Sequence, residues 1–196
     1  MMKKWCFIFL CLCMCSIKLV AQESALLVID VQSNFLREDS PMHVELSSIS
    51  TFFEGINGLE YQFSQKDSTL VFYVVNEWHA PIKNWMTGNV SKAGEAGVEL
   101  DDRLLLCSDQ LYSKSKGDAL SNSALKEALM ERQIEQVVVV GLFAEGCVRK
   151  TVKSLVRHGY KVTIPSAAIA SKNGKKKEKA LRQLEAHSPF VNVIWE

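Results

Sequence analysis

The chain lacks a surplus of charge of either sign. It has 23 basic and 22 acidic residues. The first 21 residues hold three of the lysines and no acid, so residues 22–196 carry 20 basic and 22 acidic residues, a net charge of −2. A surface this close to neutral does not indicate nucleic-acid binding.

Long apolar runs are absent beyond the N-terminus. Two lysines precede an apolar run over residues 5–17, and Ala21 follows as a small residue. This pattern is typical of a secretory signal peptide, and the run is short for a spanning helix, which needs about 20 residues. We expect a signal peptide over 1–21, export to the periplasm or beyond, and no membrane attachment of residues 22–196. A retained anchor is the alternative.

Cysteine is scarce in residues 22–196, which contain only Cys107 and Cys147. Two cysteines in an exported protein can form one disulfide. A nucleophilic thiol must stay reduced, so we expect the two to remain unpaired if Cys147 is catalytic. The disulfide is the alternative.

Internal repeats and low-complexity linkers are also absent, which indicates one domain over residues 22–196. Apolar, β-branched runs predict strands, and apolar residues at helical spacing predict helices. The predicted strands are 25–31, 69–75, 136–141, 160–164 and 191–194; the predicted helices are 47–63, 123–129, 147–158 and 174–187. Strands that alternate with helices predict an α/β fold with a mostly parallel, doubly wound sheet and helices on both faces.

The segment 76–103 shows no clear hydrophobic period and contains several glycines. Long loops in compact domains are usually functional, so we expect a lid or binding segment here. Residues 104–106 and 111–112 are predicted to form short strands at most.

Cys147 is the most informative residue of the chain. A buried strand ends at Gly141, and Cys147 follows six residues later at the start of a helical pattern. This places a thiol in the first turn of a helix, at the edge where open α/β sheets bind ligands. A helix N-terminus favours a thiolate, which suits a nucleophile. The alternative is a small buried side chain.

Asp30 and Lys114 accompany Cys147 in the predicted topology. Asp30 closes the first strand, and Lys114 follows the 111–112 segment. A cysteine nucleophile needs a base to take its proton and a cation to hold the thiolate, and these two residues supply both. Asp30 could instead cap the following turn, and Lys116 competes with Lys114.

Three motifs resemble those of the isochorismatase-like cysteine hydrolases, which include the nicotinamidases and the N-carbamoylsarcosine amidohydrolases. Residues 30–35 (DVQSNF) resemble the family's Asp-x-Gln-x-x-Phe opening motif. Residues 141–148 (GLFAEGCV) resemble its nucleophile turn. Lys114, followed by leucines at 120 and 125, matches its lysine motif. The resemblance covers residues 25–170.

The resemblance implies a role for each matching residue. Asp30 would be the general base, Lys114 would stabilise the thiolate, and Cys147 would attack a carbonyl. A cis peptide is implied between Leu142 and Phe143, with the backbone N–H groups of Phe143 and Cys147 as the oxyanion hole. The presence of the cysteine implies hydrolysis of a small amide, carbamoyl or related C–N substrate, and the family implies a possible homo-oligomer.

A substrate pocket and a metal site are weaker expectations. Phe35, Trp78 and Leu142 are candidates for the pocket. Glu77 and His79 stand near the position of the metal ligands of nicotinamidases. Zinc usually takes three or four protein ligands, so we expect no cofactor, with a zinc- or iron-dependent nicotinamidase as the alternative.

The sequence also departs from the family pattern. Ala144 replaces a threonine in the nucleophile turn, and Asp118 and Leu120 replace other residues after the lysine. These changes leave the substrate unspecified. They also leave open a non-catalytic binding protein on the same fold.

Overall fold

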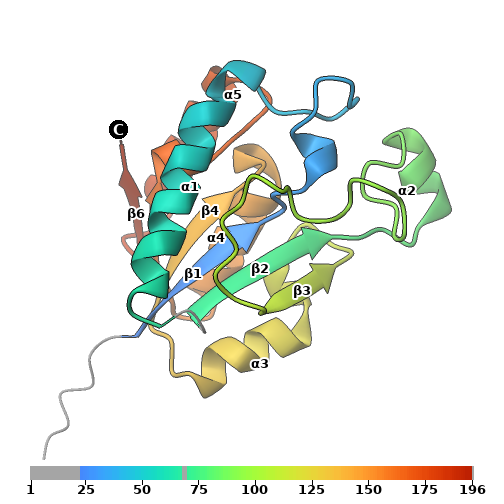
Figure 1. Cartoon of the computed structure of the whole chain (residues 1–196). Coiled ribbons are helices and arrows are strands. Elements are labelled where there is room, and N and C mark those ends of the chain that lie inside the picture. Colours follow the sequence, from blue (N-terminus) through green and yellow to red (C-terminus); the bar gives the residue numbers. More distant parts are fainter. Residues whose placement is uncertain (1–22, 68–69, 196) are drawn as a thin grey trace, which may run out of the picture.

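Six strands form a sheet at the centre of the structure, a computed structural model that describes residues 23–67 and 70–195 (Figure 1). The expected signal peptide lies outside these residues. The order is β3-β2-β1-β4-β5-β6, and all neighbouring pairs are parallel. The strands are β1 (Ser24–Ile29), β2 (Val71–Asn76), β3 (Leu111–Lys114), β4 (Gln136–Gly141), β5 (Lys161–Pro165) and β6 (Val191–Ile194).

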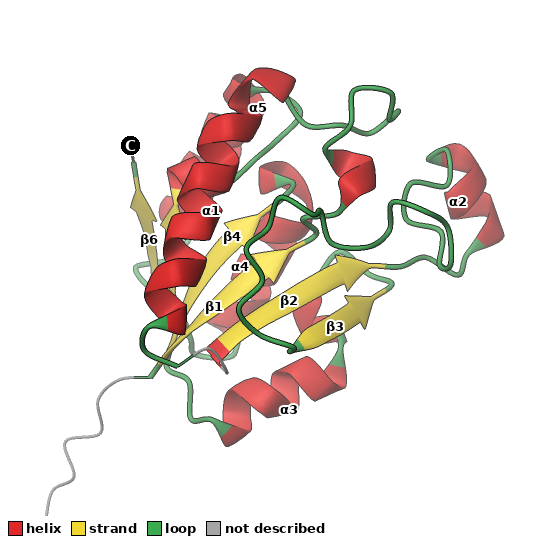
Figure 2. Cartoon of the chain, in the orientation of Figure 1, coloured by secondary structure: helices red, strands yellow, loops and turns green. Residues whose placement is uncertain are grey.

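Helices cover both faces of the sheet, which confirms the predicted doubly wound α/β fold (Figure 2). One face packs against α3, α4 and α5, and the other packs against α1. The helices are α1 (Ile49–Ser64), α2 (Pro81–Met86), α3 (Ser123–Glu131), α4 (Arg149–Arg157) and α5 (Gly174–Glu185). In the described part of the chain, no helix has both the length and the apolar character needed to cross a bilayer.

The segment 76–103, predicted as a loop, contains the short helix α2. Its large side chains face solvent: Ile82, Trp85 and Met86 are 76%, 82% and 72% exposed. A six-residue helix without a buried stripe gives no hydrophobic period, so the sequence pattern did not indicate it. Residues 104–106 do not form a strand.

Alternate residues of β1 contribute to two separate cores. Ala25, Leu27 and Ile29 pack with α3, α4 and α5, whereas Leu26 and Val28 pack with α1. None of the five side chains is exposed. Burial on both faces explains why this strand is a continuous apolar run in the sequence.

The strand order reverses between β1 and β4. From β1 the chain moves outward through β2 to β3, and from β4 it moves the other way through β5 to β6. Open α/β sheets bind ligands beyond the carboxyl ends of the strands at such a point. Asp30 follows β1 and Cys147 follows β4. The topology therefore brings two predicted site residues to this edge.

Gly141 allows the end of β4 to lie against β1. Its φ is +116°, and a Cβ atom there would lie 2.0 Å from the carbonyl oxygen of Ile29. The same oxygen accepts a hydrogen bond of 2.9 Å from the N–H of Leu142. Only glycine fits this approach, which directs the chain into the turn that carries Cys147.

Glu60 is a fully buried acid on α1, far in sequence from the predicted site. Burial raises the pKa of its carboxyl from 4.5 to about 7. The Tyr73 hydroxyl and the Leu105 backbone partly offset this rise, although neither makes a close hydrogen bond to the carboxyl oxygens. The folded protein therefore holds a proton on Glu60 that the unfolded chain releases at lower pH.

This buried acid predicts a pH-dependent effect of Glu60→Gln. Because the pKa is higher in the folded state, the favourable contribution of protonated Glu60 is present below pH 4.5 and is lost as the pH rises through about 7. The loss is on the order of 3 kcal/mol. We expect Glu60→Gln to raise the free energy of unfolding by that amount at pH 8.5 and to change it little at pH 5, in urea titrations.

Glu54→Gln, at an exposed position of the same helix, is the matched control and should change stability little at either pH. Equal destabilisation by Glu60→Gln at both pH values would contradict the expected protonation of Glu60.

Candidate active site

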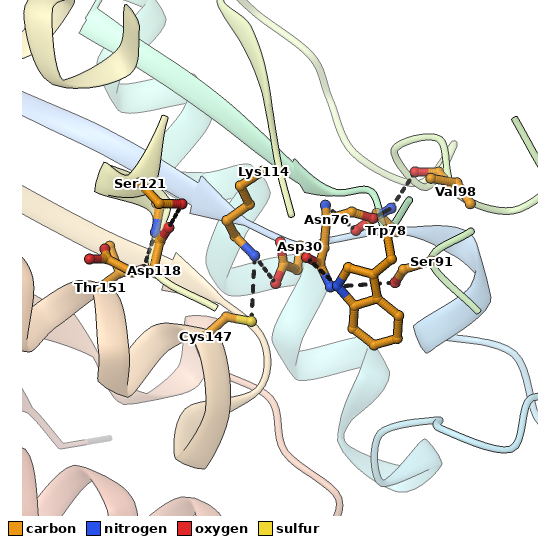
Figure 3. A network of polar contacts seen from close by, with 12 residues as sticks. Asp30, Asn76, Trp78, Ser91, Val98, Lys114, Asp118, Ser121, Cys147 and Thr151 are labelled. Carbon is orange, nitrogen blue, oxygen red and sulfur yellow. Dashed lines mark hydrogen bonds and ion pairs between the residues drawn. The ribbon is translucent and has the colours of Figure 1, made fainter. Parts of the chain in front are cut away.

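Asp30, Lys114 and Cys147 meet at the edge of the sheet (Figure 3). The Lys114 Nζ atom lies 2.9 Å from Asp30 Oδ2 and 3.4 Å from Cys147 Sγ. The Lys114 and Asp30 side chains are 0% and 2% exposed. The competing candidate Lys116 is exposed, so the structure brings Lys114 and not Lys116 to the thiol.

Backbone hydrogen bonds fix the position of each of these residues. Asp30 adopts a φ of +55°, and its N–H donates to the Val74 carbonyl at 2.8 Å. Lys114 is the last residue of β3, in register with Asn76 of β2. The ends of three strands therefore supply the constellation, and the side chains converge because parallel strands end at the same edge.

The turn between β4 and α4 holds Cys147. The Leu142–Phe143 peptide bond is cis, as the resemblance implied. The Phe143 carbonyl accepts hydrogen bonds from the N–H groups of Gly146 and Val148, at 2.8 and 3.3 Å. Residues 144–148 form a wide π-helical turn, and α4 begins only at Arg149. Gly146 is not helical, so Cys147 follows a kink and leads directly into α4, close to the predicted first turn of the helix.

The electrostatics of the thiol differ from the sequence-based expectation. Burial and the carboxylate of Asp30 raise the pKa of Cys147 to about 12, and the opposing effect of Lys114 is smaller. Burial alone would lower the pKa of Lys114, but Asp30 and Cys147 outweigh it and raise that pKa. Burial and the Asp30 carboxylate thus favour the protonated thiol, which does not support the expectation of a resting thiolate at a helix N-terminus.

Gln32 is a positioning residue that the sequence analysis quoted in a motif without assigning a role. It is fully buried, and its Oε1 atom accepts a 2.8 Å hydrogen bond from the N–H of Asn76. Its Nε2 atom donates to the carbonyls of Asn76 and Val98. The Gln32 side-chain amide thus connects the turn after Asp30 by hydrogen bonds to the end of β2 and to the 76–103 segment.

The three pocket candidates lie on the α1 side of the sheet. Phe35 packs edge-on against Phe143, with ring centroids 5.4 Å apart. Trp78 donates its indole N–H to Asn76 Oδ1 at 2.9 Å (Figure 3). Leu142 has no exposed surface and belongs to the core. All three are buried and stay predictions for the substrate pocket, and Trp78 also lines a hollow beside α2.

The weak metal candidates do not converge. Glu77 lines a hollow with residues 94–100, and His79 lines a different one beside α2. Within residues 23–67 and 70–195, no group of three His, Cys, Asp or Glu side chains is arranged to hold a metal ion. A nicotinamidase-type metal site therefore does not fit Glu77 and His79 as they stand.

Both cysteines outside the leader are free. Cys147 packs against the core on the α3–α5 side, and Cys107 packs against the core on the α1 side. The sheet separates the two thiols, which is consistent with the expected absence of a disulfide.

Comparison with known proteins gives the family. Nicotinamidase 3 of Arabidopsis thaliana is 23% identical over 169 residues, which span 82% of this chain and 80% of that protein. An isochorismatase family protein from Desulfovibrio vulgaris superposes with a TM-score of 0.77 at 20% identity, covering 88% of this chain and 94% of that one. Pyrazinamidase of Pyrococcus horikoshii, in complex with zinc, gives 0.74 at 19% identity, covering 89% and 99%.

These solved structures share the fold of this chain. The sequence itself matches the Isochorismatase domain over residues 24–194, nearly all of the described structure. The chain therefore belongs to the isochorismatase family of hydrolases.

Proposed function

We propose that the protein is a cysteine hydrolase that cleaves the C–N bond of a small amide or carbamoyl substrate. The observation that carries this proposal is the position of Lys114 Nζ, which contacts both Asp30 and Cys147 in a buried cluster. A base, a cation and a thiol within hydrogen-bonding reach form the arrangement that cysteine nucleophiles need.

The raised pKa of Cys147 requires a general base, and Asp30 is the candidate for this role. The resting thiol is neutral, so Asp30 must take its proton as Sγ attacks the substrate carbonyl carbon. The S–C bond forms, and the negative charge on the former carbonyl oxygen is stabilised by the N–H groups of Phe143 and Cys147. The charge of Lys114 stays in place and keeps the carboxylate oriented.

Three proton transfers complete the cycle. Protonated Asp30 gives its proton to the leaving nitrogen, the C–N bond breaks, and a thioester on Cys147 remains. Water then loses a proton to Asp30 and attacks the thioester. The S–C bond breaks, the acid leaves, and Asp30 returns the proton to the cysteine sulfur.

The proposal is tested by trapping the thioester. The full chain is mixed with a panel of primary amides and carbamoyl compounds that includes nicotinamide. Ammonia release is followed, and quenched samples are analysed by intact mass. We expect turnover of at least one compound and a mass increase equal to its acyl group on the peptide that contains Cys147. Cys147→Ser should show neither turnover nor the adduct.

Two outcomes separate this proposal from its alternatives. Activity that is lost after chelation and restored by zinc or iron would favour a metal-dependent nicotinamidase. Substrate binding without ammonia release or an adduct would indicate a non-catalytic binding protein. The absence of a metal-ligand cluster in the described residues supports retention of activity after chelation.

A further inference from the structure

Positive charge is concentrated on two neighbouring helices. The α4 helix contains four basic residues and no acidic residue, and α5 contains five basic and two acidic residues. Residues 22–196 as a whole have a net charge of −2. The two helices pack on the same face of the sheet and contribute to the same core. The chain is therefore strongly polarised, with this face positive and the remainder negative.

A hollow of about 440 Å³ lies on this positive face, along α4. Its lining residues are Asp118, Lys150, Lys153, Arg157 and His187. Three of them lie on one face of α4, at spacings of three and four residues, and His187 comes from the chain just after α5. The volume falls in the range of small-molecule sites, which is about 300–1,000 Å³.

The cations of this hollow have no acidic partners. Within the described residues 23–67 and 70–195, none of the cations Lys150, Lys153 and Arg157 forms an ion pair. By contrast, Arg182 on α5 is paired with Glu178. Like charges at these helical spacings repel each other. No ion pair relieves this repulsion, although Asp118 also lines the hollow, so a bound anion would meet three cations that no ion pair neutralises.

Two details show where an anion would lie. A Cβ atom on Gly117 would lie 2.7 Å from Cδ and 2.9 Å from Nζ of Lys150, so the glycine makes room for this lysine side chain. The acidic Asp118 lines the same end of the hollow. It would repel an anion there, which leaves Lys153, Arg157 and His187 as the main contacts.

We propose that this hollow binds an oligophosphate group, either free or carried by a lipid headgroup. A guanidinium presents paired N–H donors that match phosphate oxygens, and lysine adds a mobile point charge. Two or more phosphates in a row would reach successive turns of α4. The site is separate from Cys147 and does not depend on the proposed hydrolase activity.

Isothermal titration with inorganic tripolyphosphate in 150 mM NaCl tests this site. The double variant Lys153→Gln/Arg157→Gln should bind at least about 30-fold more weakly than the wild-type chain. The control Lys172→Gln/Lys176→Gln removes two exposed charges near and on α5, outside the hollow, and should lose less than about threefold. Cys147→Ser should bind as the wild type does.

A second arm distinguishes the source of the phosphate. Phosphatidylcholine vesicles that contain a phosphatidylinositol bisphosphate, whose headgroup carries several phosphates, are sedimented with each variant. Binding of these vesicles but not of tripolyphosphate, lost only in Lys153→Gln/Arg157→Gln, would support the site and assign it to a lipid headgroup. Equal losses in both double variants, or no binding to either probe, would overturn it. The melting temperature of Lys153→Gln/Arg157→Gln should not fall, because repulsion within α4 is reduced.

Discussion

Replacing Asp30 with asparagine should abolish hydrolysis and at the same time make Cys147 easier to alkylate. The carboxylate of Asp30 raises the pKa of the thiol, and Lys114 lowers it. Asparagine keeps the shape and removes the charge, so the thiolate would pair with Lys114 alone. We expect alkylation by iodoacetamide at pH 7 to accelerate about tenfold or more. Turnover of the substrate found in the panel should fall about 10³-fold, because the base is gone.

Both rates are measured in a Cys107→Ser background, so that Cys147 is the reactive thiol. Asp102→Asn, which neutralises an exposed acid, should leave both rates unchanged. Slower alkylation of Asp30→Asn than of the wild type would show that Asp30 favours the thiolate, contrary to the electrostatics of the site. Faster alkylation together with slower turnover would identify Asp30 as a catalytic base. A residue that only supports the fold would not change the two rates in opposite directions.

Lys114→Met should reduce both activity and stability. Methionine has a similar length but no charge, so it leaves the buried carboxylate of Asp30 without its cation. Removing one partner of a buried ion pair costs about 3–5 kcal/mol in the free energy of unfolding. Loss of the preorganised charge should also lower kcat/KM by roughly 10³-fold. Urea unfolding at pH 7 and kcat/KM on the panel substrate measure the two effects.

Lys116→Met is the matched control, two residues away and exposed. It should change stability by less than about 0.5 kcal/mol. The double variant Asp30→Asn/Lys114→Met removes both charges and should recover most of the lost stability while it remains inactive. If Lys114→Met were as stable as the wild type, the buried ion pair would not be formed in solution.

The sequence was sufficient for the fold because its central strands β1 and β2 are buried on both faces and give continuous apolar runs. The β4 and β6 strands have the predicted bounds, and β1 differs by one or two residues at its ends. The run 136–141 is short, rich in β-branched valine and ends in glycine, and these features favour a central strand over a buried helix. The exposed helix α2 has no such pattern, and no local signal replaces it.

The residues of the candidate site could be predicted from the sequence, but the pKa of Cys147 could not. Lys114 and Asp30 are 84 residues apart, and the predicted strand topology together with the motifs placed them at one site. The degree of burial depends on packing across the sheet, which the sequence pattern does not encode. For this reason the sequence predicted a stabilised thiolate at Cys147, whereas burial and the Asp30 carboxylate raise the pKa of this thiol. The role of Gln32 likewise depends on contacts with distant backbone groups.

Folding must close a long loop before this site exists. Leu26 of β1 and Val138 of β4 are partners in register, although about 110 residues separate them. Asp30 and Lys114 precede β4 in the chain, and Cys147 follows β4. A chain in which β1 and β4 have not yet paired holds the base and the nucleophile apart. Nascent or partly folded protein therefore carries an ordinary thiol, and the proposed base and cation reach it only when the two halves of the sheet join.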